Sequence, residues 1–315
     1  MPPDGLLERL DAGEVLVLDG AVGTELQRRG VPMDSEAWCG LANLSHPDEV
    51  AAVHADYIAA GADLITTNTF ATARHVLEGA GHGDLTEPAT REAVVLARRA
   101  AAEAGRPDVL VLGSMSSMAP LGSWQATPTG AEVVAAYREQ AAILAAAGAD
   151  ALVAEMMLDI PNAALVIEAA IGTGLPVLVG WSGSPDGRGG VATFRSDLIE
   201  RPEPGSFDDL MRRGVALGGD VHGIMHSAVD VTGPALRILA RHWDGPTMAY
   251  PETGRFEPPD WVFTDDLSPG EYGEQSRRWV GGGVQIVGGC CGTTPEHIAA
   301  TVAAVTEHRE TRRYA

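Results

Sequence analysis

The chain has little of three things that would tie it to particular environments: cysteine, basic residues and long apolar runs. It has only 3 cysteines in 315 residues and no C-x-x-C pair, which excludes a disulfide framework and favours a reducing compartment. The 22 basic residues are outnumbered by 43 acidic ones, and the net charge of -21 argues against nucleic acid or anionic lipid as a partner. The first residues lack a signal-peptide pattern, and no apolar run is long enough to span a bilayer. We expect a soluble cytoplasmic protein with no nucleic-acid and no membrane partner; the sequence does not indicate its oligomeric state.

What the sequence does contain is a regular alternation of strand and helix patterns. Eight short, β-branched runs occur, at residues 15–19, 63–67, 109–113, 151–155, 176–181, 221–226, 246–250 and 284–289. Between them lie alanine-rich segments of helical period, such as 48–62 and 130–149, which have a glycine just before the next strand. This alternation predicts parallel strands with right-handed crossovers, and eight units predict a single (β/α)8 barrel domain over residues 1–315. An open doubly wound sheet is the alternative.

Segments rich in Gly, Ser and Pro, at 114–128, 182–208 and 251–276, are expected to be long loops after strands. Active sites of such barrels lie where the strands end and these loops begin. The residues at or just beyond the predicted strand ends include acids, a histidine and two thiols, and together they form a candidate site: Asp19, Thr67, Ser114, Glu155, Trp181, His226, Glu252, Cys290 and Cys291.

The run "IVGGCCGTTPEHI", residues 286–298, holds two adjacent cysteines after the last predicted strand. Flanking glycines allow a sharp turn that lets Cys290 and Cys291 converge on one ion; the alternatives are structural thiols or a vicinal disulfide. His226 is the natural third ligand, because a His/Cys/Cys set is a pattern for catalytic zinc with one open position. Strand alternation would place His222 on the same face, roughly 13 Å deeper. The alternative for His226 is a hydrogen-bonded histidine at the barrel end.

Four stretches at corresponding places give the chain its resemblance to a known family. They are "LDGAVGTEL" (18–26), "HADYIAAGADLITTNTF" (54–70), "YREQAAILAAAGADALVAE" (137–155) and "WVGGGVQIVGGCCGTTPEHI" (279–298). In these the chain resembles the zinc-dependent homocysteine S-methyltransferases over nearly its whole length. The resemblance implies one (β/α)8 barrel in which three cysteines hold zinc, the metal binds the substrate thiol, and a methyl group passes to sulfur.

Carried over by position, the resemblance implies that Cys290 and Cys291 are two zinc ligands. It also implies that Asp19, Gly20, Thr67 and Glu155 line the amino-acid pocket. A homocysteine ammonium group needs a carboxylate partner, and charge-assisted hydrogen bonds are strong in a partly dry site. From the residues alone, Asp19 is equally a turn or cap residue and Glu155 equally a surface acid.

Four departures from the family pattern lie at the predicted rim. Met225-His226 stands where the family usually has Asn-Cys, and Met156 stands where threonine is common. The chain reads "PETG" (251–254) where the family usually has "PN" and then glycine. It reads "GSMSSMAPLGSW" (113–124) where the family usually has a Gly-Pro turn. Zinc with two thiolates and a neutral imidazole has no net charge, so a bound thiol would be more acidic and its sulfur less nucleophilic. The cobalamin-independent methionine synthases, a separate family, use histidine with cysteines for similar chemistry.

We therefore expect a methyltransferase in which a thiolate held by zinc attacks the methyl group of a sulfonium donor in line. Asp19 and Glu155 are the expected catalytic carboxylates, with the role of orienting the acceptor. The expected partners are homocysteine as thiol acceptor and S-methylmethionine or S-adenosylmethionine as donor, with methionine as product.

Betaine fits less well as the donor. Trp38, Phe70 and Trp124 could surround a quaternary ammonium, but Met156 stands where the betaine enzymes have a tyrosine. The alternatives are methylation of another thiol or selenol, or a non-catalytic barrel that binds an amino acid. Cys39 is expected to be incidental, with a role as a stand-in ligand as the alternative.

Overall fold

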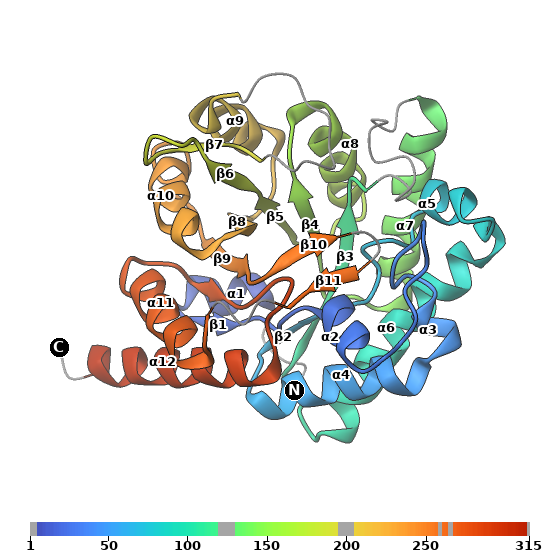
Figure 1. The fold of residues 1–315 in the computed structure, drawn as a ribbon, viewed down its shortest axis with the longest axis horizontal. Helices are drawn as coiled ribbons and strands as arrows, with labels where there is room; N and C mark the ends of the chain where they lie inside the picture. Colours follow the sequence, from blue (N-terminus) through green and yellow to red (C-terminus); the bar gives the residue numbers. More distant parts are fainter. Residues whose placement is uncertain (1–4, 119–129, 195–204, 258–259, 264–266, 314–315) are drawn as a thin grey trace.

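A ring of parallel strands forms the centre of the computed structural model, which describes residues 5–118, 130–194, 205–257, 260–263 and 267–313 (Figure 1). The strands are β1 (Leu16–Val17), β2 (Leu64–Thr66), β3 (Leu110–Ser116), β4 (Ala151–Met157), β5 (Val177–Trp181), β8 (Val221–Ala228), β9 (Thr247–Glu252) and β12 (Ile286–Val287). Their order is β1-β12-β9-β8-β5-β4-β3-β2, and a parallel bridge from Leu18 to Leu64 joins the last strand to the first. All eight predicted strands are present. The (β/α)8 barrel is confirmed, and the open sheet is wrong.

Helices surround the ring, and all but the first, which precedes β1, come after a strand. They are α1 (Leu6–Asp11), α2 (Val22–Arg28), α3 (Ala42–Ser45), α4 (Pro47–Ala60), α5 (Arg74–Gly79), α6 (Thr86–Glu103), α7 (Ala131–Ala147), α8 (Ile160–Ile171), α9 (Phe207–Gly214), α10 (Val229–Leu239), α11 (Pro269–Gly281) and α12 (Pro295–Arg313). As predicted, α4 and α7 end at Gly61 and Gly148, whose φ angles of 104° and 99° suit glycine. No helix in the described ranges is both long and apolar enough to cross a membrane.

Alternation along the strands divides the core into two layers. One layer fills the inside of the ring and includes Leu16, Leu64, Leu112, Val153, Leu178, Val221 and Met248. The other lies between the strands and the helices and includes Val17, Ile65, Val111, Leu152, Val179 and Ile224. Successive side chains on a strand therefore point either into the barrel or out towards the helices.

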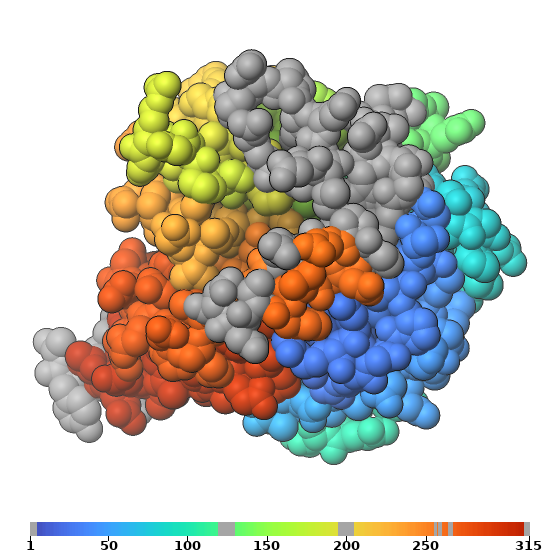
Figure 2. Space-filling model, in the orientation of Figure 1, coloured from blue at the N-terminus to red at the C-terminus, as the bar shows by residue number. Residues whose placement is uncertain are grey.

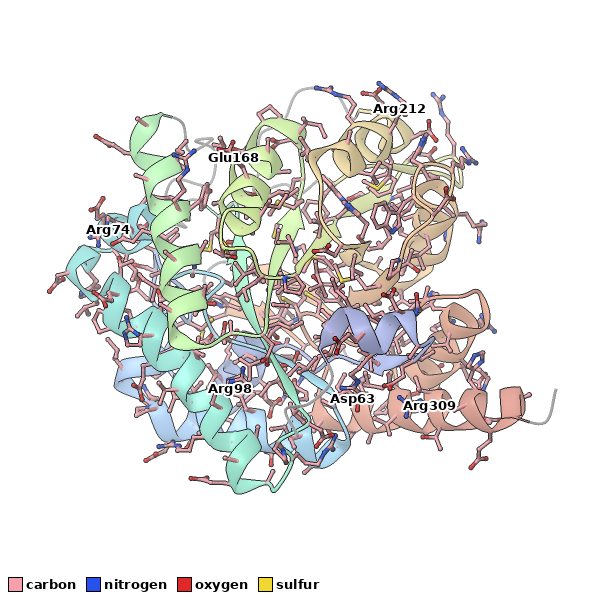
Figure 3. The ribbon with its side chains drawn as sticks, turned by 180° about the vertical axis from the view of Figure 1, so that it is seen from behind. Asp63, Arg74, Arg98, Glu168, Arg212 and Arg309 are labelled. Carbon is pink, nitrogen blue, oxygen red and sulfur yellow. The ribbon has the colours of Figure 1, made fainter. Side chains whose placement is uncertain are left out.

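Aspartates brace the amino-terminal end of the ring, opposite the predicted site. Asp63, Asp150 and Asp220 each directly precede a strand, and each accepts a hydrogen bond from a backbone N–H of the neighbouring strand, at 3.0, 2.6 and 2.8 Å. Asp63 also lies 3.7 Å from Arg309 of the last helix. Both residues are labelled in the view from behind (Figure 3). These contacts hold the strands and the last helix together at the amino-terminal end of the ring. The carboxyl ends of the strands, where barrels of this type have their active sites, are not involved in them.

Two of the predicted loops contain small antiparallel ribbons. β6 (Gly183–Pro185) pairs with β7 (Val191–Thr193), and β10 (Arg255–Glu257) pairs with β11 (Asp260–Val262). The second ribbon lies against the blue amino-terminal segment in Figure 2, because Gln27 of α2 exchanges two hydrogen bonds with the backbone of Trp261, at 2.9 and 2.7 Å. The prediction of loop throughout 251–276 is wrong at its end, where α11 begins at Pro269. Most of the predicted loop 114–128 lies outside the described residues, and β3 extends to Ser116.

Candidate functional site

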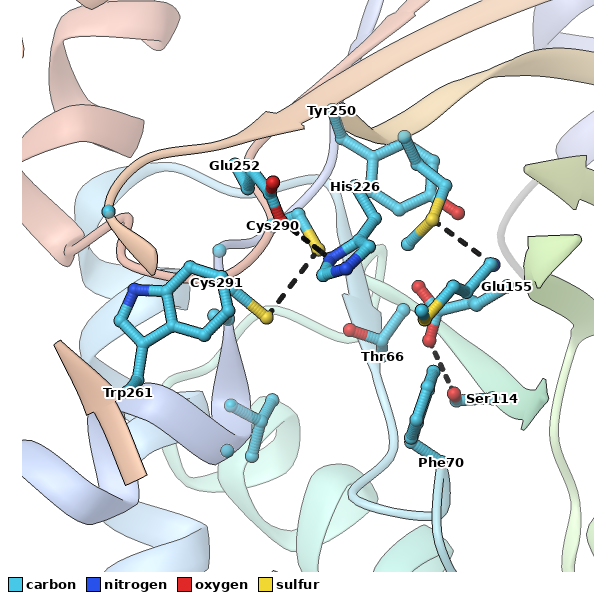
Figure 4. A pocket seen from close by; sticks show the side chains of 18 of the residues that line it. Thr66, Phe70, Ser114, Glu155, His226, Tyr250, Glu252, Trp261, Cys290 and Cys291 are labelled. Carbon is cyan, nitrogen blue, oxygen red and sulfur yellow. Dashed lines mark hydrogen bonds and ion pairs between the residues drawn. The ribbon is translucent and has the colours of Figure 1, made fainter. Parts of the chain in front are cut away.

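A cavity of about 750 Å³ opens at the carboxyl ends of the barrel strands (Figure 4). This volume is typical of sites for small molecules. The cavity is lined by nine residues that the sequence had singled out: Asp19, Gly20, Thr67, Ser114, Glu155, His226, Glu252, Cys290 and Cys291. The barrel thus brings together residues that lie up to 272 positions apart in the chain, since they lie at or near the carboxyl ends of seven of its strands.

Trp181, the last residue of β5, and His222, near the start of β8, point away from this cavity. Trp181 and His222 belong to the outer layer, where Trp181 Nε1 donates a hydrogen bond to His222 Nδ1 at 3.1 Å and the two rings stack. Trp243 packs edge-on against His222 with a centroid distance of 4.5 Å. The inclusion of Trp181 in the candidate site and the inward placement of His222 are therefore wrong. Both positions fall on the helix-facing side of the strand alternation.

His226 reaches the cavity through a break in that alternation. By simple alternation His226 would share the outward face of His222 and Ile224. The pairing of β8 with β9 shifts register between Met225 and Ala228, and His226 has a φ angle of 39°, in the left-handed region. A bulge with positive φ re-aims a side chain, and here it turns the imidazole into the barrel mouth. His226 lies at the rim as predicted, but not for the reason predicted.

The two cysteines lie on a tight turn after β12. Gly292, the next residue, has a φ angle of 82°, and a Cβ built there would lie 1.8 Å from the carbonyl oxygen of Thr253. The backbone N–H of Thr253 in turn donates to the carbonyl of Cys291 at 2.8 Å. Glycine is therefore required for the loops after β9 and β12 to touch, and this contact fixes Cys290 and Cys291 at the cavity wall.

Three potential metal-binding atoms converge at this wall. The Sγ atoms of Cys290 and Cys291 lie 3.9 Å apart, and Nδ1 of His226 lies 3.9 Å from Sγ of Cys290. One ligand atom from each of the three residues lies within 4.8 Å of the other two. Tetrahedral zinc with N and S ligands at about 2.0 to 2.3 Å has ligand-to-ligand edges of roughly 3.4 to 3.8 Å. The trio is thus close to the dimensions of a zinc site, and Figure 4 shows the three side chains facing one another.

A fourth group, Glu252 at the end of β9, contacts the imidazole of this trio. Its Oε2 atom lies 2.7 Å from Nδ1 of His226. Burial alone would lower the pKa of His226, but the charges of Glu252 and Cys290 outweigh burial and raise this pKa to about 10 in the metal-free protein. The Cys291 thiol and burial raise the pKa of Cys290 well above its usual value.

Two carboxyl groups lie deeper in the cavity, that of buried Asp19 and that of partly buried Glu155. Asp19 accepts hydrogen bonds from the backbone N–H and the hydroxyl of Thr66, both at 2.8 Å, and Glu155 accepts one from the hydroxyl of Ser114. Burial raises the pKa of Asp19 well above its usual value, against the effect of its hydrogen bonds, and the charge of Glu155 raises it further. Burial likewise raises the pKa of Glu155, although its hydrogen bond with Ser114 opposes the rise. A cation placed between these groups would restore their charged forms.

Thr67 and Gly20 shape the cavity wall. The Thr67 hydroxyl lies 2.7 Å from the Thr69 hydroxyl and accepts a hydrogen bond from the backbone N–H of Ser114. Its hydrogen bonds are therefore made within the protein. A Cβ on Gly20 would lie 2.7 Å from the hydroxyl of Tyr57, which leaves no room for a side chain. Both residues lie where the sequence placed them, with contacts that are mainly structural.

Several lining residues were not identified from the sequence. Tyr250, Phe194 and Trp261 line the cavity; the rings of Phe194 and Trp261 lie 5.2 and 6.2 Å from the His226 ring, measured between centroids. Tyr250 is the last residue of a predicted strand and could have been found by the rule that located Glu155. Phe194 and Trp261 come from the ribbon loops, where no periodic signal exists. Trp124, one of the aromatic candidates, lies outside the described residues.

Cys39 lines the same cavity but does not belong to the trio of His226, Cys290 and Cys291. Its thiol donates to Oδ1 of Asn68 at 3.0 Å, and burial raises its pKa to about 12. A thiol with this pKa remains protonated at neutral pH and is a poor ligand. This agrees with the expectation that Cys39 is incidental.

Comparisons with known proteins agree over the whole barrel. The family model described as homocysteine S-methyltransferase matches residues 16–305. The homocysteine S-methyltransferase YbgG of Bacillus subtilis is 27% identical over 92% of this chain and 94% of its own length. A methionine synthase of Mycobacterium leprae is 32% identical over 95% of this chain, which spans 25% of that longer protein. The crystal structure of the metallated homocysteine methyltransferase MmuM from Escherichia coli superimposes with a TM-score of 0.70 at 24% identity, covering 93% of this chain and 97% of that one.

Proposed function

Because this chain belongs to the homocysteine S-methyltransferase family, we propose that its cavity transfers a methyl group from a sulfonium donor to the thiol of homocysteine, giving methionine. The observation that carries the proposal is the convergence of His226, Cys290 and Cys291 beside the carboxyl groups of Asp19 and Glu155 in one cavity. A metal held by the histidine and the two cysteines can activate a thiol. The two carboxyl groups can hold the ammonium group of the same amino acid. Homocysteine carries both groups.

The donor set fits zinc as the resident metal. Two thiolates and an imidazole suit a borderline-soft ion with tetrahedral preference, and the separations of 3.9 Å exceed tetrahedral edges only slightly. Zinc, when bound, would act as a Lewis acid that makes a thiol reactive at neutral pH. His226, Cys290 and Cys291 would hold the ion, and the turn at Gly292 would keep the sulfurs convergent.

Charge supports the orientation of the acceptor. Among the described residues that line the cavity there is no Arg or Lys, whereas four carboxyl groups line it: Asp19, Glu155, Glu252 and Glu257. An ammonium group bound near Asp19 and Glu155 would make charge-assisted hydrogen bonds in a partly dry environment. We propose that these two residues bind and orient the amino acid and transfer no proton.

The same features favour a cationic donor. Trp38 and Phe70 line the cavity with their rings edge-to-face, 6.2 Å apart, and Phe194 and Trp261 lie nearer the metal-binding trio. Aromatic faces and acidic groups attract cations, and a sulfonium is a cation that carries a transferable methyl group. We propose S-methylmethionine or S-adenosylmethionine as the donor.

The test is to incubate the zinc-loaded protein with homocysteine and each donor separately, including betaine, and to quantify methionine. Cys291→Ser should lose both bound zinc and product. Cys39→Ser is the matched control, because it removes a thiol from the same cavity outside the trio, and it should keep its zinc. Absence of methionine with every donor from a fully zinc-loaded protein would refute the proposal.

A further inference from the structure

The hydroxyl of Tyr250 has no role in the proposed function, although Tyr250 lines the cavity. Tyr250 belongs to β9, lies in the inner layer of the barrel and is only 2% exposed. Its hydroxyl makes no hydrogen bond within the described part of the chain. A buried tyrosine usually finds a partner for its O–H group, so an unpaired hydroxyl in a cavity wall points to a ligand that pairs with it.

Packing holds this hydroxyl in place. A Cβ built on Gly180 of β5 would lie 2.5 Å from the Tyr250 oxygen and 2.6 Å from Cγ of Met225. The lack of a side chain at Gly180 therefore makes room for the end of the tyrosine ring. Burial, and after it the charge of Glu155, raises the pKa of Tyr250 well above its usual value. The hydroxyl therefore remains a protonated donor at neutral pH.

The other hydroxyls of buried residues in the cavity wall are already used by the protein. Those of Thr66, Thr67 and Ser114 each make a hydrogen bond with another side chain. Tyr250 lies beside Glu155, close enough to oppose the rise in the pKa of this carboxyl group, but the contact lacks the geometry of a hydrogen bond. Tyr250 thus keeps an O–H group for a ligand, next to a carboxyl group that is proposed to hold an ammonium group.

A carboxylate bound in this cavity needs neutral donors. With His226 as a metal ligand, no positively charged side chain among the described residues lines the cavity, and four carboxyl groups do. An α-amino acid carries its carboxylate on the same carbon atom as its ammonium group, so an ammonium group held by Glu155 places the carboxylate near the hydroxyl of Tyr250. A hydrogen bond from a hydroxyl to a carboxylate is charge-assisted and therefore strong.

We propose that Tyr250 is a substrate-binding residue whose hydroxyl donates a hydrogen bond to the α-carboxylate of the acceptor amino acid. The inference rests on the proposed function only in taking an α-amino thiol as the acceptor and Asp19 and Glu155 as the groups that hold its ammonium. Tyr250 then selects thiols that carry a carboxylate over simple aminothiols. Because this donor is neutral, the cavity keeps the acidic character that attracts a cationic methyl donor.

The test compares two ligands that differ by one group. Homocysteine and 3-mercaptopropylamine share the thiol and the ammonium group, and only homocysteine has the carboxylate. Isothermal titration calorimetry gives their dissociation constants for the zinc-loaded unaltered protein and for zinc-loaded Tyr250→Phe. Loss of the hydroxyl should weaken the binding of homocysteine about 10- to 100-fold and that of 3-mercaptopropylamine by no more than a few-fold.

Tyr137→Phe is the matched control. Tyr137 of α7 is also buried, with a hydroxyl that makes no hydrogen bond in the described ranges, but it is not among the described residues that line the cavity. This variant should leave both dissociation constants unchanged. Both Phe variants should unfold at the same denaturant concentration as the unaltered protein or at a higher one, because neither loses a hydrogen bond within the protein.

Three results would overturn the inference. They are an unchanged affinity of Tyr250→Phe for homocysteine, an equal loss of affinity for both ligands, and a marked fall in the unfolding midpoint of Tyr250→Phe. An equal loss would mean that the hydroxyl acts on the ammonium group or through Glu155, and a fall in the midpoint would mean that it is structural. Failure of methyl transfer alongside the expected loss of homocysteine affinity would refute the proposed function and leave this assignment standing. Methionine formation with an unchanged affinity in Tyr250→Phe would do the reverse.

Discussion

The left-handed backbone at His226 allows a test of how this side chain reaches the cavity beside Cys290 and Cys291. His226→Ala and His226→Gly both remove the imidazole and its contact with Glu252, so the difference between them isolates the backbone. At a φ angle of 39°, a residue with a Cβ carries about 1 to 2 kcal/mol of strain that glycine avoids. Glycine loses about 0.5 to 1 kcal/mol relative to alanine through its extra unfolded-state freedom. We therefore expect His226→Gly to be the more stable variant by about 1 kcal/mol, the difference of these two effects.

The assay is denaturant unfolding of the metal-free variants, followed by circular dichroism in the presence of a chelator. Ala142→Gly is the control, because Ala142 is exposed in the interior of α7, where the backbone has an ordinary helical conformation. There the same change from alanine to glycine should destabilise the protein by about 0.5 to 1 kcal/mol. If His226→Ala proves as stable as His226→Gly or more so, the bulge does not hold His226 in the left-handed region and our account of its orientation fails.

Three further predictions concern the cysteine turn, the acceptor pocket and the core. Gly292→Ala should lose zinc binding and unfold more easily, because its Cβ would lie 1.8 Å from the carbonyl oxygen of Thr253. Zinc content after gel filtration measures the loss of binding, and one bound zinc per protein molecule would contradict it. Glu155→Gln should raise KM for homocysteine about 10- to 100-fold, because one charged hydrogen bond to the ammonium group is lost. Its kcat and zinc content should stay near their original values. Steady-state kinetics measure this, and an unchanged KM would exclude the ammonium contact. His54 is fully buried with neither ring nitrogen hydrogen-bonded, and burial lowers its pKa to about 4. The unfolded state therefore takes up the proton first as pH falls below about 6.5, and His54 should reduce stability by about 2 kcal/mol between pH 7 and pH 5. Denaturation of His54→Leu at both pH values should show a smaller loss than the unaltered protein, and an equal loss would contradict this.

Most of the fold was predictable from the sequence because its signals are local. Each strand is a short apolar run, and helices such as α4 and α7 end at glycines that adopt a left-handed conformation. Barrel architecture then determines that residues at strand ends share one rim, which is why Asp19, Glu155 and Cys290 could be assigned to one site. The family match over residues 16–305 agrees with this assignment of the fold.

Side-chain direction was less predictable, because it depends on pairing between strands. Trp181 and His222 lie in predicted strands, yet the direction in which side chains alternate along β5 and β8 places both against the helices. Phe194 and Trp261 carry no periodic signal, since their positions depend on ribbons within long loops.

The sequence alone determined the number of strands, their parallel order and the set of chemical groups available at the rim, since these follow from local apolar patterning and chain connectivity. Only the tertiary structure decided which groups meet. A register shift between β8 and β9 turns His226 inward and sets Glu252 beside it, and a contact between two loops brings Cys290 and Cys291 to the same wall. Contacts of this kind join residues 26 to 64 positions apart, and they depend on how strands align, which no local stretch of sequence specifies.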